Sequence, residues 1–175
     1  MKKNIAILVA AMLVTGCGYV TNRYSMSADN VMAARSWNGV MVNVGNFTEA
    51  PNTKASCNYK GPINTIDGES YGQFVRNALV SELTIAGAYS ESAPITITGR
   101  LDRLDNATAF DTSWSLDVTL TSSNGKSASV KETYKYHGSI VGTTDSTCSA
   151  AAAGFVPAVQ NLVGKMIREI PKSLL

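Results

Sequence analysis

Few side chains in this sequence are of the types that do chemistry, and their spacing gives catalysis little support. The single histidine, His137, lies at the end of a predicted strand, and Asp67 and Glu69 are the nearest pair of carboxylates. Acid–base or glycoside-hydrolase chemistry would need these groups to face one another across a substrate. A cell-wall hydrolase that uses Asp67, Glu69 and His137 is therefore a remote alternative, and we expect the protein not to be an enzyme.

Cys17 offers a different kind of chemistry, acylation of its thiol. Lys2 and Lys3 precede an uncharged apolar run at residues 5–14, which is the pattern of a secretory signal peptide. A helix of this length rises about 15 Å, half of a bilayer's hydrocarbon core, so the run is too short to span a membrane. A thiol is the only good nucleophile available here to accept a diacylglycerol group. The alternative is that Cys17 is an ordinary thiol.

Val14-Thr15-Gly16-Cys17 resembles the lipobox of bacterial lipoproteins, in which an aliphatic residue, a small residue and Gly or Ala precede the cysteine. The resemblance implies that residues 1–16 are removed as a signal peptide and that lipid on Cys17 anchors the protein to a membrane. Residues 17–26 would then be a lipidated tether. Gly18 stands where lipoproteins retained in the inner membrane carry Asp, so the resemblance implies the outer membrane, with the body facing the periplasm.

Cys57 and Cys148 remain as an even pair once Cys17 is acylated. In an oxidising compartment such a pair predicts a disulfide, and closing so long a loop is worth about 4 to 5 kcal/mol in chain-entropy models. Two separate buried thiols are the alternative. Two cysteines and one histidine are too few ligands in any zinc-like spacing, so we expect no metal and no cofactor.

Charge and length favour one exported domain and argue against nucleic-acid binding. The chain carries 15 basic and 13 acidic side chains, and removal of residues 1–16 takes away two lysines, which leaves the two signs equal. A nearly neutral chain without a basic run lacks the electrostatic footprint for nucleic acid. Residues 27–175 suffice for a single periplasmic α+β domain.

The first half of that domain predicts a short helix, a strand, a long loop and a longer helix. The short helix spans 27–35, the β-branched run at 39–47 predicts a strand, and the loop at 48–69 would be pinned by the disulfide. The longer helix spans 70–86. It begins with a capping box formed by Ser70 and Gln73 and ends before Gly87, which suits a left-handed cap.

The second half predicts three strands, at 94–104, 110–121 and 127–137, with a hairpin at Asn124-Gly125. Apolar and polar residues alternate along each strand, so one face of the sheet is predicted to be covered and the other to be solvated. The polar face is a possible flat, uncharged surface for a glycan or for another protein's strand. Its candidate binding residues are Thr96, Thr98, Ser115, Thr119, Ser129 and Thr133.

An amphipathic helix over 150–171 ends the chain, and Pro157 either begins its regular part or kinks it. The predicted order is therefore a short helix followed by β-α-β-β-β-α. The β-α-β crossover makes the first two strands parallel and the meander after them antiparallel, which gives a four-stranded mixed sheet. Both amphipathic helices would pack on its apolar face.

A lipobox, a tether and this element order resemble the small envelope lipoproteins of the YajG and LptE kind, whose domains are similar to the N-terminal domain of TolB. The resemblance is one of fold. It implies a non-enzymatic, membrane-anchored lipoprotein that acts as a binding or assembly partner of an envelope protein. A glycan- or lipid-binding module is the alternative, on the strength of the polar face and the long loop.

Overall fold

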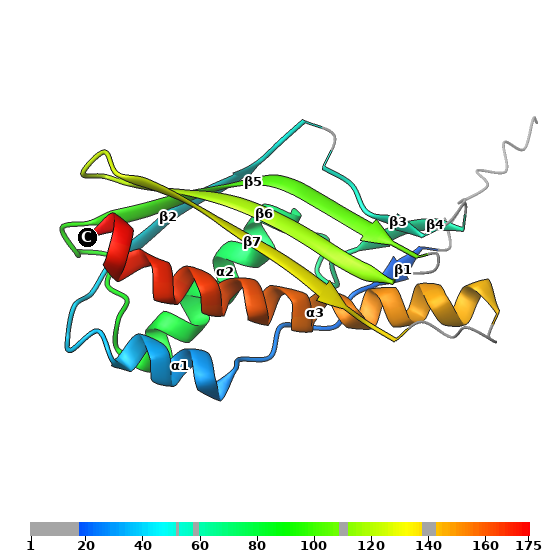
Figure 1. The fold of residues 1–175 in the computed structure, drawn as a ribbon, viewed down its shortest axis with the longest axis horizontal. Helices are drawn as coiled ribbons and strands as arrows, with labels where there is room; N and C mark the ends of the chain where they lie inside the picture. The colour runs from blue at the N-terminus through cyan, green and yellow to red at the C-terminus, as the bar shows by residue number, and fades with distance from the viewer. Residues whose placement is uncertain (1–17, 52, 58–59, 109–111, 138–142) are drawn as a thin grey trace, which may run out of the picture.

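The computed structural model describes residues 18–51, 53–57, 60–108, 112–137 and 143–175 (Figure 1). Cys17 and the proposed signal peptide lie outside these ranges. In chain order the elements are β1 (Tyr19–Val20), α1 (Ala28–Arg35), β2 (Asn43–Glu49), β3 (Ser56–Cys57), β4 (Gly61–Asn64), α2 (Tyr71–Ala86), β5 (Thr96–Ala107), β6 (Ser113–Ser122), β7 (Ser127–Lys135), α3 (Thr144–Glu169) and a π-helical turn, η1 (Ile170–Leu174).

The main sheet has four strands in the order β2-β5-β6-β7. β2 runs parallel to β5, and the β5–β6 and β6–β7 pairs are antiparallel, so the predicted mixed sheet is confirmed. The hairpin between β6 and β7 turns at Asn124-Gly125, where Gly125 has a φ of 87°. The α+β class and the predicted order of the large elements are therefore those of the structure.

Both long helices cover the same face of this sheet, where the core lies. The ring of Phe155 on α3 lies 5.2 Å from Phe74 on α2 and 5.0 Å from Trp114 on β6, measured between centroids. The indole N–H of Trp114 donates to the carbonyl of Ala151 at 2.8 Å, so its one polar atom is satisfied in the core. These rings join the sheet and both helices into one packed unit.

Gly99 on β5 is required by that packing. A Cβ at this position would lie 2.6 to 2.7 Å from three ring atoms of Phe47, which is closer than carbon atoms approach. The ring of Phe47 packs this close to the β5 backbone because residue 99 has no side chain. Any larger residue there would push Phe47 out of the core.

α2 confirms the predicted bounds but uses only half of the predicted capping box. The hydroxyl of Ser70 accepts the backbone N–H of Gln73 at 3.2 Å, and Gly87 adopts the left-handed conformation with φ 74°. The Gln73 side chain donates instead to Oδ1 of Asn77 at 3.3 Å. Gln73 therefore stabilises the exposed side of the helix one turn further along.

α3 begins earlier than predicted. Thr143 is its N-cap, and its hydroxyl accepts the backbone N–H of Ser146, so the helix covers Cys148 instead of following it. Pro157 lies within the continuous helix, which begins at Thr144 and ends at Glu169. A proline here removes one helical hydrogen bond, and the packing of the apolar stripe of α3 against the sheet offsets that loss.

The prediction of a long loop at 48–69 is wrong. β3 and β4 lie within it and form a second, three-stranded sheet in the order β1-β4-β3. The prediction of a tether over 17–26 is wrong for the described residues, because Tyr19 and Val20 pair in parallel with Ile63 and Asn64. Strands of two residues, as in β1 and β3, or of four, as in β4, are too short to show a period, which is why sequence alternation did not reveal them.

The predicted disulfide is present. It joins Cys57 on β3 to Cys148 on α3, two fully buried residues whose Cα atoms lie 5.6 Å apart. The second sheet is thereby fixed to the N-terminal part of α3, at the end of the molecule where the described chain begins (Figure 1). Among the described residues, no helix is long and apolar enough to cross a bilayer.

Candidate functional site

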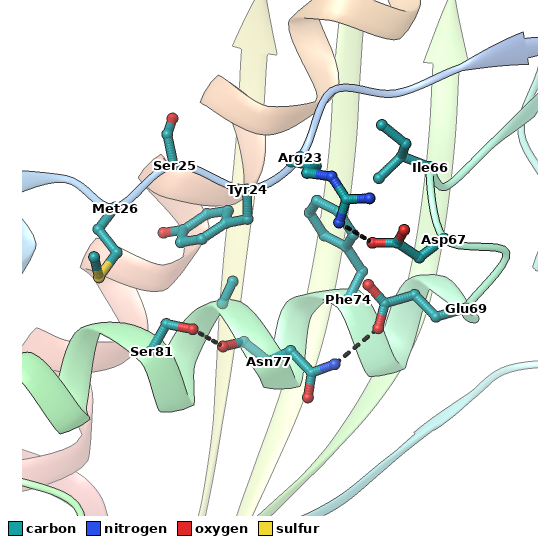
Figure 2. A pocket seen from close by; sticks show the side chains of 11 residues that line it. Arg23, Tyr24, Ser25, Met26, Ile66, Asp67, Glu69, Phe74, Asn77 and Ser81 are labelled. Carbon is teal, nitrogen blue, oxygen red and sulfur yellow. Dashed lines mark hydrogen bonds and ion pairs between the residues drawn. The ribbon is translucent and has the colours of Figure 1, made fainter.

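A groove lies between α2 and the segment Arg23–Ser27, which we call the strap (Figure 2). The groove has a volume of about 530 Å³, within the usual range for ligand sites. Residues 66–69, which lead into α2, close one end of it. Its lining comprises Arg23, Tyr24, Ser25, Met26, Ile66, Asp67, Glu69, Phe74, Asn77, Ala78 and Ser81.

Glu82 on α2 holds the strap in place. Its Oε1 accepts the phenol hydroxyl of Tyr24 and, at 3.0 Å, the backbone N–H of Ser27, which is the N-cap of α1. The side-chain amide of Gln160 on α3 donates to the backbone carbonyl of Ser25 at 2.6 Å. The strap is thus bound to both long helices by polar contacts.

The Glu82 carboxyl group is fully buried, and its Oε2 has no hydrogen-bond partner among the described residues. Burial raises the pKa of Glu82, and hydrogen bonds from Tyr24, Ser27 and Asn30 offset only part of that rise. Burial also raises the pKa of the Tyr24 phenol, and the neighbouring carboxylate raises it further. The attachment point of the strap is therefore a carboxyl group that resists ionisation.

The groove combines an apolar floor with an acidic end. The rings of Tyr24 and Phe74 meet edge to face, with centroids 6.2 Å apart. At the acidic end, Asp67 forms an exposed ion pair with Arg23 at 2.8 Å, and Glu69 accepts the side-chain amide of Asn77 at 2.8 Å. Burial is the main cause that raises the pKa of Glu69, with a further contribution from the charge of Asp67. One cation faces two carboxylates, so the acidic end carries a surplus of negative charge.

The groove is suited to binding, and the three residues named for hydrolysis do not meet in it. Asp67 and Glu69 both line it, whereas His137 is exposed just beyond the end of β7. In the described part of the chain, no three His, Cys, Asp or Glu side chains gather as metal ligands would. The arrangement provides apolar contact and hydrogen bonds.

The predicted polar face exists, but it is not uncharged. Ser115 lies opposite Thr133 and Thr119 lies opposite Ser129, while Thr96 and Thr98 lie along β5. All six candidate residues are exposed or half-buried. The same face also carries two ion pairs, Arg100 with Asp102 at 3.5 Å and Lys131 with Asp117 at 3.6 Å.

Two cationic side chains bind backbone carbonyls on the two edge strands of the main sheet, β2 and β7. Arg76 on α2 donates to the backbone carbonyls of Gly45 and Val44 on β2, at 2.7 and 2.9 Å. On the opposite edge, Lys165 on α3 donates to the carbonyl of Lys131 on β7 at 2.7 Å. Occupied carbonyls discourage another strand from adding to either edge.

Comparison with known proteins shows a likeness of fold. No family model matches the chain, and no curated protein matches it. A protein from Xanthomonas campestris assigned to the family DUF330 is 12% identical over 87% of this chain and 93% of its own, with a TM-score of 0.59. An uncharacterized protein is 12% identical over 87% of this chain and 99% of its own, with a TM-score of 0.50.

A PelC dodecamer from Paraburkholderia phytofirmans is 15% identical over 83% of this chain and 95% of its own, with a TM-score of 0.41. At these identities the matches concern the fold alone. The resemblance to the YajG and LptE lipoproteins stays a prediction.

Proposed function

We propose that this chain is a non-enzymatic lipoprotein of the bacterial outer membrane that binds another envelope protein through the strap groove. The observation that supports this most is the position of β1. Tyr19 is already paired with Ile63, so only Gly18 separates the sheet from the proposed lipidation site at Cys17. A lipid on Cys17 would hold the disulfide-linked end of the body at the periplasmic surface of the membrane.

The chemistry of the strap groove favours an extended peptide segment as its ligand. The floor made by Tyr24 and Phe74 would take an apolar side chain. The surplus negative charge at Asp67 and Glu69 would favour a neighbouring Lys or Arg. Arg76 and Lys165 occupy backbone carbonyls on the two edge strands, which makes strand addition less favourable than binding in the groove.

Cross-linking in cells tests the partner. A photo-crosslinking amino acid at Met26, on the rim of the groove, should give one reproducible protein adduct. Met41 is a matched control, because it is 48% exposed where Met26 is 49% exposed and it does not line the groove. Absence of an adduct at Met26, or the same adduct from both positions, would contradict the proposed contact.

Mass spectrometry tests the anchor separately. The intact mature protein should lack residues 1–16 and carry the added mass of acyl chains on Cys17. The variant Cys17→Ser should keep its signal peptide, because serine provides no thiol for acylation. An uncleaved and unmodified amino terminus in the wild type would overturn the lipoprotein assignment while leaving the groove to be tested by cross-linking.

A further inference from the structure

A second hollow lies at the open edge of β2, on residues that the strap groove does not use. It has a volume of about 580 Å³. Its polar lining comes from the start of β2, the first turns of α2 and the segment after α2, and comprises Asn43, Asn46, Gln73, Arg76, Tyr89 and Glu91. Side chains from three separate parts of the sequence therefore converge on one open site.

Arg76 forms a rigid cationic wall of this hollow. Three of its N–H groups donate, to the carbonyls of Gly45 and Val44 and, at 3.2 Å, to Oδ1 of Asn77. A guanidinium has five N–H donors, so two are left over. In the described part of the chain Arg76 has no carboxylate within ion-pair distance, so its positive charge is not neutralised.

The other groups in the hollow supply acceptors, donors and one ring. Asn46 and Glu91 are exposed, Tyr89 is half-buried, and the side chains of these three residues have no hydrogen-bond partner within the described ranges. The Asn43 amide donates to Oγ1 of Thr96 at 3.4 Å, which leaves its carbonyl oxygen as an acceptor. The hollow thus offers the fixed donors of Arg76, acceptors on Asn43, Asn46 and Glu91, and a single aromatic ring.

We propose that this hollow binds a carbohydrate chain. Sugar hydroxyls both donate and accept, so they can satisfy Arg76 and Glu91 at once, whereas a simple anion would be repelled by Glu91 and a simple cation by Arg76. The C–H face of a pyranose ring suits the face of Tyr89, which is amphipathic. The lining has too little other apolar surface for an acyl chain.

The predicted polar face of the sheet lies where a bound carbohydrate would continue beyond the hollow. Gly45 lies between the hollow and β5, and a Cβ there would be 2.9 Å from Thr98 Cγ2 and 3.1 Å from Thr96 Cγ2. Because residue 45 has no side chain, the methyl groups of Thr96 and Thr98 lie close to the backbone that lines the hollow. The site therefore suits an oligosaccharide of several units, with further sugars on Thr96 and Thr98.

A titration followed by NMR tests the site. The full chain, solubilised in a detergent without a sugar headgroup, is titrated separately with the linear tetramers of glucose and of N-acetylglucosamine. We expect at least one tetramer to shift the backbone resonances of residues 43–46 and 89–91. The variants Asn46→Ala and Glu91→Ala, both at exposed positions, should each weaken binding by about tenfold or more.

Ser149→Ala is the matched control, because Ser149 is an exposed polar residue on α3 that lies neither in the hollow nor on the polar face of the sheet. It should leave the affinity unchanged. No shift at residues 43–46 with either tetramer at about 10 mM, where millimolar binding would be visible, overturns the proposal. Shifts confined to other residues, or equal loss in Ser149→Ala, also overturn it. Neither result bears on the strap groove, which is tested by cross-linking at Met26.

Discussion

Two glutamates of this protein, Glu82 and Glu132, are buried, and their surroundings differ. Glu132 on β7 lies 2.6 Å from the ammonium of Lys165 and also accepts the side-chain amide of Asn161 at 3.1 Å. Glu82 on α2 has no cation within ion-pair distance among the described residues, and one of its oxygens accepts the hydroxyl of Tyr24 and the N–H of Ser27. The other oxygen of Glu82 has no partner among the described residues.

The difference separates a contact that holds the main unit together from a contact that responds to protonation. Lys165 and Glu132 join α3 to β7, inside the main unit, by a compensated ion pair. Glu82 joins α2 to the strap, which carries the chain toward Cys17, and its charged form is poorly compensated. A buried carboxyl group in such a place makes the strap's attachment depend on protonation.

Lys165→Ala should have the largest effect of the changes that probe this comparison. It leaves Glu132 buried without its cation, and we expect unfolding free energy to fall by about 3 kcal/mol in chemical denaturation. The double variant Glu132→Leu with Lys165→Met is the control, because an apolar pair of similar volume should recover most of the loss. A double variant as unstable as Lys165→Ala would mean that the ion pair is not the cause.

Glu82→Ala should destabilise the protein by about 2 kcal/mol, because it leaves the Tyr24 hydroxyl and the Ser27 N–H, both half-buried, without an acceptor. Amide hydrogen exchange should increase at residues 23–27 more than in β5 and β6. Equal increases everywhere would show that Glu82 supports the whole core and not the strap in particular.

Tyr24→Phe should be milder, a loss of about 1 kcal/mol, because the ring still packs on Phe74 and only one hydrogen bond disappears. Thermal melting beside Glu82→Ala measures the difference. A loss as large as that of Glu82→Ala would assign the strap's attachment to the tyrosine hydroxyl alone.

The smallest effect is a pH dependence. The pKa of Glu82 in the folded protein is raised above its ordinary value of 4.5, so the protonated form favours folding. The stability that this provides is complete below that ordinary value and is lost as pH rises through the raised pKa. The variant Glu82→Gln cannot ionise, so the wild type should lose stability relative to it as pH increases from 4 to 8, in paired melting curves. Parallel curves would contradict the assignment.

The large elements of the fold were predictable because local signals and long-range packing agree. Ser70 and Gly87 mark the ends of α2, Asn124-Gly125 marks the hairpin, and strict alternation marks the buried face of β6. The disulfide was predictable by counting the cysteines that remain once Cys17 is set aside as the predicted lipidation site.

The strap and the second sheet were not predictable, because the residues that form them carry no local period. Tyr24 and Glu82 are far apart in the sequence, and neither predicts the other. A weak signal was present, since Glu82 lies on the apolar stripe of α2 and Glu132 occupies an inward position between Val130 and Tyr134. A charge on a buried stripe indicates a polar partner, but the sequence does not say from which element it comes.

The disulfide also has a consequence for the order in which the molecule is completed. Its two cysteines are separated by 91 residues, so a chain that is delivered from its amino terminus offers one thiol long before the other. Until the final helix arrives, Cys57 has only wrong partners, including the thiol of a neighbouring molecule. Secretion of a form truncated before Cys148 should therefore yield covalent dimers linked through Cys57.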